Sequence, residues 1–219
     1  MKVRIEWTYR TPKGLKTSCF TEVMPAGKAI VLAEDMERTG RAKEVSFVDT
    51  HDSTWTLKEL KAQLKEIETE PHDVKVYFDG GFDLSTRRSG LGCAIYFEQN
   101  GKSMRLRKNA LVDELQTNNE AEYAALHLAI QELEAMGVHD MPVTFVGDSQ
   151  VVINQMNDEW PCLEEELSRW ADRIDEKLAD MGVTPEFVHL SRKENREADR
   201  LASQALKGVE VESTTEAKE

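Results

Sequence analysis

Glu122 is a carboxylate in a place where carboxylates are unfavourable. It lies on the apolar stripe of a predicted helix, whose other members are Ala125, Leu126, Ala129, Ile130 and Leu133. A stripe of this kind normally faces a hydrophobic core. Burying a carboxylate there raises the free energy of the folded state unless a partner or a cation compensates its charge. The position of Glu122 therefore predicts a pairing or coordinating role.

Two aspartates follow predicted strands in the same way. Asp79 ends "VKVYFD" and Asp148 ends "VTFVGD". If these strands are parallel neighbours, both carboxylates emerge at one sheet edge, where open α/β sheets bind ligands. A helix cap before "SQVV" is the competing interpretation of Asp148. Asp199 borders the apolar stripe of a last helix, "ENREADRLASQAL", and is equally unusual as a surface residue.

Four converging carboxylates would repel one another and raise their own pKa values. Hard divalent cations resolve this conflict, because Mg²⁺ takes a few carboxylate oxygens together with water and substrate phosphate. Two such ions about 4 Å apart can activate a water and stabilise the leaving oxygen of a phosphodiester. The four residues together predict a two-metal phosphodiesterase site.

The elements that must position these residues form an α/β pattern between residues 74 and 207. Strands are expected at 74–79, 91–98, 102–109, 143–148 and 186–190, with residues 80–90 as a loop. Helices are expected at 118–136, from Ser149, at 163–181 and at 194–207. Strands mixed with covering helices indicate a mixed five-stranded sheet flanked by helices. The polar tail, 208–219, is predicted to be disordered.

Residues 1–70 indicate a separate small α+β domain of order ββαβα. Strands are expected at 3–10, 16–24 and 44–50, with a helix that ends at Gly40 and another capped by Ser53 or Thr54. Trp7 and Tyr9 alternate in phase with the apolar residues of the first strand, which favours core packing over base stacking.

The charge of the chain is unevenly distributed. Residues 1–70 hold 12 basic and 12 acidic residues, so the net charge of −13 falls on residues 71–219. This excess argues against a general nucleic-acid binder, which needs Lys and Arg for phosphate contacts. No apolar run could span a bilayer and the N-terminus lacks a signal-peptide core, so no membrane association is expected. Three widely spaced cysteines fit a reducing cytoplasm.

Four segments carry a family resemblance. "YFDGG", "TNNEAEYAAL", "GDSQVV" and "ENREADRLA" resemble the four acidic motifs of type 1 ribonuclease H, in its reverse-transcriptase-like branch. The resemblance covers about residues 74–207. It implies a ribonuclease H-like fold that binds two Mg²⁺ or Mn²⁺ ions through Asp79, Glu122, Asp148 and Asp199, with Asp79 bridging both ions. It also implies endonucleolytic cleavage of RNA in RNA/DNA hybrids, leaving 3′-hydroxyl and 5′-phosphate ends.

The resemblance assigns further roles. His189 and Arg192 are rival candidates for a residue that assists catalysis. The implied substrate-binding residues are Gly80, Gly81, Thr117, Asn118, Asn119, Ser149, Gln150 and Asn195. Two departures from the family bear on substrate affinity: Glu120 stands beside the asparagines, and "NDEWPCLEEELSRW" is acidic where many relatives are basic. Some relatives carry a hybrid-binding N-terminal domain, so residues 1–70 are interpreted as an accessory module for substrate or partner binding.

Two other functions fit less well. A 3′–5′ exonuclease of the two-metal type has Asp-x-Glu on its first strand, whereas this chain has "DGG". A non-catalytic ribonuclease H-like module that binds nucleic acid or protein would suit the acidic surface. That all four carboxylates are present argues against it.

Overall fold

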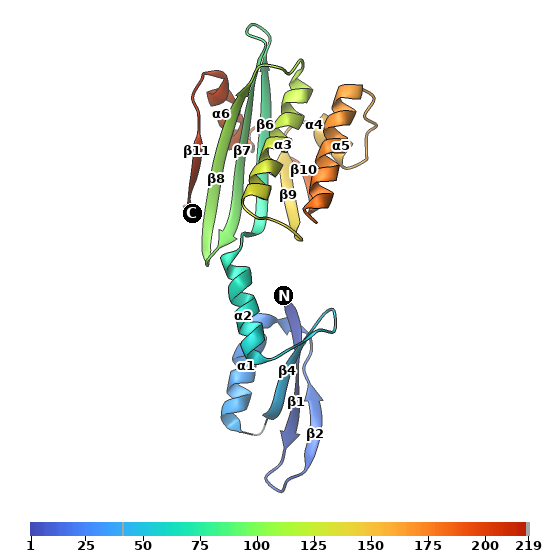
Figure 1. Cartoon of the computed structure of the whole chain (residues 1–219), viewed down its shortest axis with the longest axis vertical. Helices are drawn as coiled ribbons and strands as arrows, with labels where there is room; N and C mark the ends of the chain where they lie inside the picture. Colours follow the sequence, from blue (N-terminus) through green and yellow to red (C-terminus); the bar gives the residue numbers. More distant parts are fainter. Residues whose placement is uncertain (41, 218–219) are drawn as a thin grey trace. The chain divides into compact units, whose positions relative to one another are not determined.

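The computed structural model describes residues 1–40 and 42–217 of the 219-residue chain. The chain divides into two compact units, Met1–Thr69 and Glu70–Glu219 (Figure 1). Each unit has its own hydrophobic core.

The first unit is a sheet with two helices on one face. Its elements are β1 (Lys2–Arg10), β2 (Lys16–Phe20), β3 (Met24–Pro25), α1 (Ala26–Thr39), β4 (Ala42–Asp49), β5 (Thr54–Trp55) and α2 (Leu57–Thr69). The strands pair in the order β2-β1-β4-β5, with β3 added beside β1. Gly40 ends α1 in the left-handed conformation, as predicted. The expected cap at Ser53 or Thr54 is wrong, because Thr54 lies in β5 and Thr56 accepts a hydrogen bond from the Glu59 amide.

The second unit is a mixed sheet of six strands with helices on both faces. Its elements are β6 (His72–Asp83), β7 (Arg88–Gln99), β8 (Lys102–Val112), α3 (Asn118–Ala135), β9 (Pro142–Gly147), α4 (Gln150–Met156), α5 (Glu165–Asp180), β10 (Thr184–His189), α6 (Arg196–Leu206) and β11 (Glu212–Glu216). The strand order is β10-β9-β6-β7-β8-β11. The predicted α/β architecture, a mixed sheet flanked by helices, is confirmed.

Two details of the predicted sheet are corrected. Segment 208–219, predicted to be disordered, contains β11, which pairs antiparallel with β8 and makes the sheet six-stranded rather than five-stranded. The buried side chain of Asn109 anchors this segment: it donates to the Leu201 and Val209 carbonyls and accepts from the Val211 amide. Gly80 and Gly81 lie within β6, so the predicted loop 80–90 shrinks to the turn between β6 and β7.

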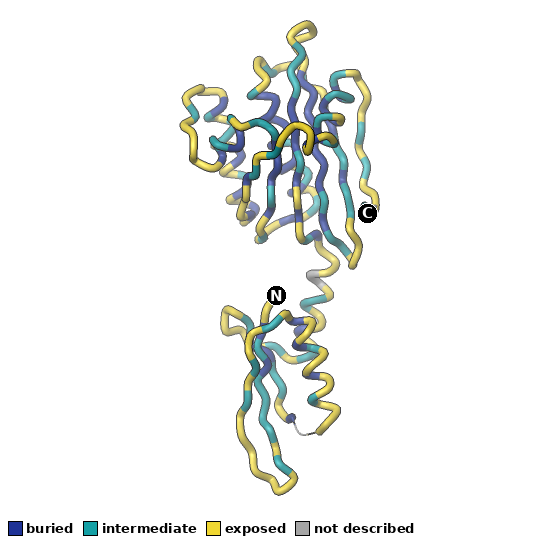
Figure 2. The backbone as a smooth tube through the Cα atoms, turned by 180° about the vertical axis from the view of Figure 1, so that it is seen from behind, coloured by how far each residue is buried: buried dark blue, intermediate teal, exposed yellow. Residues whose placement is uncertain are grey.

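Glycines in the sheet allow two helices to approach unusually closely. A Cβ on Gly80 would lie 2.2 Å from the backbone of Ala121 in α3. On the opposite face, a Cβ on Gly90 would lie 2.2 Å from the Ala202 carbonyl oxygen in α6. Buried residues therefore run through the centre of the sheet and the helices against it, whereas the loops are exposed (Figure 2). Within the described residues, no helix is both long and apolar enough to cross a membrane.

Candidate active site

Parallel pairing places two aspartates at one end of the sheet. β6 and β9 are parallel neighbours, and Tyr77 pairs with Val146 two residues before each aspartate. Asp79 continues along β6 while β9 ends at Gly147, so Asp148 emerges beside Asp79. The predicted convergence of these two carboxylates is confirmed.

Glu122 reaches the same point from α3. The close approach at Gly80 holds α3 against β6, and the Gly80 amide donates a hydrogen bond of 3.1 Å to Glu122 Oε2. Glu122 is only 5% exposed. Although it lies on an apolar stripe, Glu122 therefore faces the end of the sheet and the two aspartates.

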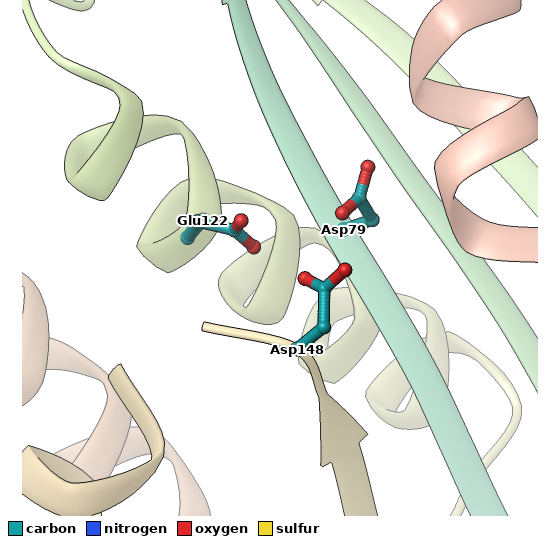
Figure 3. Close-up of side chains that lie close together, drawn as sticks. All are labelled: Asp79, Glu122 and Asp148. Carbon is teal, nitrogen blue, oxygen red and sulfur yellow. The ribbon is translucent and has the colours of Figure 1, made fainter. Parts of the chain in front are cut away.

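Asp79, Glu122 and Asp148 form a compact cluster. Their carboxylates point toward one another from β6, α3 and the end of β9 (Figure 3), and one oxygen of each lies within 4.8 Å of the others. Burial, together with the charges of Asp148 and Asp199, raises the pKa of Asp79 to about 7. Burial and the charges of Asp79 and Asp148 raise the pKa of Glu122 to about 9. The protein therefore leaves the ionised forms of Asp79 and Glu122 largely uncompensated, which favours their protonated forms in the absence of a cation.

Asp199 lies at the edge of this cluster. It lines the same cavity of about 570 Å³, but Asp199 Oδ1 accepts hydrogen bonds from Arg192 Nη2 at 2.7 Å and Nε at 3.1 Å. The structure thus brings three of the four predicted ligands together and holds the fourth in an ion pair. Arg192 also lines the cavity, so a cation enters a site otherwise dominated by carboxylates.

His189 and Ser149 occupy different positions beside Asp148. His189 Nε2 lies 3.2 Å from the Asp148 carbonyl oxygen. His189 is exposed, and it is not among the described residues that line the cavity. Ser149 caps α4 by accepting a hydrogen bond from the Val152 amide, and it also lines the cavity. Because Ser149 is the cap, the Asp148 side chain is free to join the cluster.

The start of α3 explains the unusual Glu120. Thr117 accepts a hydrogen bond from the Glu120 amide, while Glu120 Oε2 accepts hydrogen bonds from the amides of Thr117 and Gln116. This capping box fixes the first turn of the helix that carries Glu122. Glu120 is buried, and its role in the capping box is structural. Thr117, which was predicted to bind substrate, is exposed, and its hydroxyl takes part in the same capping box.

The remaining predicted substrate residues separate into two groups. Gly80, Gly81 and Asn118 line the cavity, and Asn118 Oδ1 accepts a hydrogen bond from the Phe82 amide. Asn119 is half-buried and Gln150 is exposed, and neither is among the described lining residues.

Asn195 requires a correction. It is 1% exposed, and its Nδ2 donates a 2.8 Å hydrogen bond to the Phe78 carbonyl, which ties the start of α6 to β6. A side chain buried in this way positions Asp199 rather than touching a substrate. Ser203 also lines the cavity and was not predicted. The signal for it was present in the sequence, because position 203 lies one helical turn after Asp199.

Comparisons with known proteins agree with this geometry. A family described as reverse transcriptase-like matches residues 77–205. The chain belongs to the ribonuclease H family, in its reverse-transcriptase-like branch. Ribonuclease HI of Halobacterium salinarum is 37% identical over 93 residues, 41% of this chain and 44% of that protein.

Solved ribonucleases H share the fold of the second unit. LC11-RNase H1 in complex with an RNA/DNA hybrid has a TM-score of 0.56 and 28% identity, covering 62% of this chain and 98% of that one. RNase H1 from Halobacterium salinarum has a TM-score of 0.53 and 27% identity, with the same coverage. Family and fold together support ribonuclease H activity in general.

A further relative extends beyond the ribonuclease H unit. The uncharacterized protein YpeP of Bacillus subtilis (strain 168) is 42% identical over 192 residues, 88% of this chain and 84% of that protein. This alignment is longer than the second unit, Glu70–Glu219, and therefore includes part of the first. The similarity to YpeP is therefore not confined to the second unit.

Proposed function

We propose that this protein is a divalent-metal-dependent ribonuclease H that cleaves the RNA strand of RNA/DNA hybrids endonucleolytically. The observation that carries the proposal is the cluster of Asp79, Glu122 and Asp148, in which one oxygen of each side chain lies within 4.8 Å of the others. The cluster occurs in a chain that belongs to a family of nucleases. The relative solved with an RNA/DNA hybrid supports the choice of substrate.

The donor set of the site fits Mg²⁺ or Mn²⁺. All three clustered side chains offer carboxylate oxygens, which hard divalent cations prefer. Cations would also favour ionisation of Asp79 and Glu122, whose pKa values are raised to about 7 and 9 without them. When bound, two such ions activate a water and stabilise the leaving oxygen of a phosphodiester.

The protein's own residues bind, orient and balance charge. Asp79, Glu122 and Asp148 would hold the ions, and Asp199 would join them from the same cavity when Arg192 moves away. Arg192 would then be free to attract a substrate phosphate. Asn118, at the rim of the cavity, would contact the hybrid, and the 2′-hydroxyl would mark its RNA strand.

A cleavage assay with matched variants tests this proposal. Labelled RNA/DNA hybrid, duplex RNA and single strands are incubated with the full chain in Mg²⁺ or Mn²⁺, and only the hybrid should be cut. Glu122→Gln should remove this activity, whereas Glu176→Gln, the same substitution at an exposed position of α5, should keep it. Hybrid cleavage that survives Glu122→Gln would reject the assigned site. No cleavage in either metal would favour a binding module.

We further propose that the first unit adds substrate affinity. Arg10 pairs with Lys16 and Thr8 pairs with Lys43 across the sheet, so three cations share one face. Both helices pack on the opposite face, which carries Val3 and Ile5. Trp7 packs against that core, in agreement with its predicted role. Arg10, Lys16 and Lys43 lie on the face that the two helices leave uncovered, where Glu6 pairs with Arg4 and Glu44 accepts a hydrogen bond from the Thr8 hydroxyl. The three cations suit contact with phosphates.

A further inference from the structure

A second cavity lies on the other flank of α6. Its volume is about 440 Å³, and Arg107, Arg196 and Arg200 line it together with Glu197, Leu201 and Val211. Arg107 comes from β8, and the two other arginines lie one helical turn apart on α6. We call it the arginine pocket.

Among the described residues that line the arginine pocket, the only carboxylate is already compensated. Glu197 Oε1 lies 3.1 Å from Arg105 Nη1, and Glu197 Oε2 accepts a hydrogen bond from the Tyr96 hydroxyl. Its negative charge is therefore not free to neutralise the three arginines of the pocket.

The arginines of the pocket have no acidic partner in the part of the chain that the structure describes. Arg107 donates from Nε at 3.2 Å and Nη2 at 3.1 Å to the neutral hydroxyl of Ser213 on β11. Arg196 and Arg200 are exposed and make no described side-chain hydrogen bond or ion pair. Three cations thus gather without a counter-charge in a unit whose residues 71–219 carry the chain's entire acidic excess.

The helix itself adds to this positive potential. Arg196 is the first residue of α6, an 11-residue helix, and the N-terminal end of a helix dipole is positive. A cation at that position is unfavourable for the helix alone. An anion bound in the arginine pocket would relieve both repulsions.

We infer that the arginine pocket binds a backbone phosphate of a nucleic acid strand. Guanidinium groups match phosphate oxygens in geometry and charge. Asp199 and Ser203 line the active-site cavity on one flank of α6, and Arg196 and Arg200 line the pocket on the other. A helix is about 10 Å thick. Along the duplex axis one strand carries a phosphate about every 3.4 Å, so about 10 Å along this axis corresponds to roughly three nucleotides. Phosphates beyond the cleaved bond would therefore reach the pocket. This inference rests on the proposed function only for the identity of the strand that is bound.

Binding in chelator separates this inference from catalysis. The full chain is titrated into a labelled RNA/DNA hybrid with chelator present, so that no cleavage occurs, and the dissociation constant is measured at several salt concentrations. The double variant R196A/R200A should bind about 10-fold more weakly at moderate salt. Its log–log salt slope should fall by up to about two, since each neutralised phosphate contributes about 0.9.

A matched control exists on another helix. Arg169 and Arg173 are also four residues apart, at exposed positions of α5, so R169A/R173A removes the same charge elsewhere. Its affinity and salt slope should stay close to wild type. Equal losses in both double variants would reduce the effect to net charge and overturn the inference, as would no loss in R196A/R200A.

A competition arm identifies the ligand. Inorganic phosphate and an acidic peptide are titrated against wild type and R196A/R200A. Arginine-dependent binding of either one, with hybrid binding unaffected by the substitutions, would overturn the strand assignment. Arginine-dependent hybrid binding by a chain that cleaves nothing would support the pocket and reject the proposed nuclease. Cleavage without that dependence would do the reverse.

Discussion

The two cavities beside α6 differ in the kind of charged group that lines them and in the exposure of those groups to solvent. In the active-site cavity, Asp79 of β6 and Glu122 of α3 are buried, and their pKa values are raised to about 7 and 9. In the arginine pocket, Arg196 and Arg200 are exposed to solvent. Solvent screens exposed charge, whereas buried like charges destabilise the fold. The active site should therefore lower the stability of the metal-free folded protein, whereas the arginine pocket should hardly affect that stability.

The largest effect is expected at Asp148. Asp148→Asn removes one metal-binding carboxylate and should lower cleavage by more than the 10–100-fold typical of losing only a group that supports a ligand. The same change removes a charge that raises the pKa values of Asp79 and Glu122. We therefore expect a higher melting temperature in chelator, by about 2–4 °C for each kcal/mol of relieved repulsion.

Thermal melts with and without metal decide this prediction. Saturating Mg²⁺ should stabilise wild type by mass action and stabilise Asp148→Asn less. Asp180→Asn, at an exposed position of α5, is the control for the substitution itself. If Asp148→Asn melts below wild type in chelator, Asp148 is a structural residue and the cluster loses its main physical support.

The stability of the metal-free protein should fall as pH rises. Both carboxyl groups have folded-state pKa values above their ordinary values of 3.8 and 4.5. The folded state therefore binds their protons more tightly, and that stabilisation is lost between about pH 4 and 7 for Asp79 and between about pH 4.5 and 9 for Glu122.

Melting temperature in chelator, measured from pH 5 to 9, checks this slope. Glu122→Gln should flatten the curve most between pH 7 and 9, where Glu122 releases its proton and Asp79 has already lost about half of its own. Glu176→Gln should leave the curve unchanged. A wild-type curve without a decline over this range would mean that the carboxylates are compensated in the folded protein.

A smaller kinetic effect should distinguish Arg192 from His189. Arg192 lines the cavity and pairs with Asp199, whereas His189 contacts only the Asp148 carbonyl among its described polar partners. Arg192→Ala should therefore reduce kcat by about 10²-fold, the lower end of the range typical of losing a group that stabilises charge in the transition state, and His189→Ala much less. Arg192→Lys, which keeps the charge, should recover part of the loss. The opposite order would assign the role to His189, and two wild-type turnovers would assign it to neither.

Local patterns were sufficient to predict the acidic residues. Asp79 and Asp148 follow apolar strands, and Glu122 interrupts an apolar helical stripe. These patterns indicated where the three meet once the two strands were assumed to be parallel neighbours. The ion pair between Arg192 and Asp199 was not predictable in this way, because it depends on how a loop folds back on α6.

Features built by distant segments were missed for a physical reason. β11 has the polar sequence "ESTTE", and its stability comes from pairing with β8 and from the buried Asn109, about 100 residues earlier. The arginine pocket likewise joins Arg107 to Arg200. Such long-range pairings leave no local periodicity. The cap of α2 at Thr56 was different, because the Thr-x-x-Glu signature was present in the sequence.

The smallest expected effect concerns the first unit, which contributes to neither of the two cavities beside α6. Removing it should therefore leave the difference between these cavities unchanged. The second unit has its own core and matches 98% of the length of LC11-RNase H1, so residues 71–219 should fold and cleave without the first unit. Deleting residues 1–70 removes the basic face formed by Arg10, Lys16 and Lys43. Without these three cations to attract phosphates, KM for the hybrid should rise several-fold, whereas kcat should stay nearly unchanged because the clustered carboxylates remain in place.

The full chain carrying R10A/K16A/K43A should reproduce most of this rise in KM. Steady-state kinetics on both proteins measures it, and identical KM values for the full chain and the truncated protein would remove the binding role from the first unit.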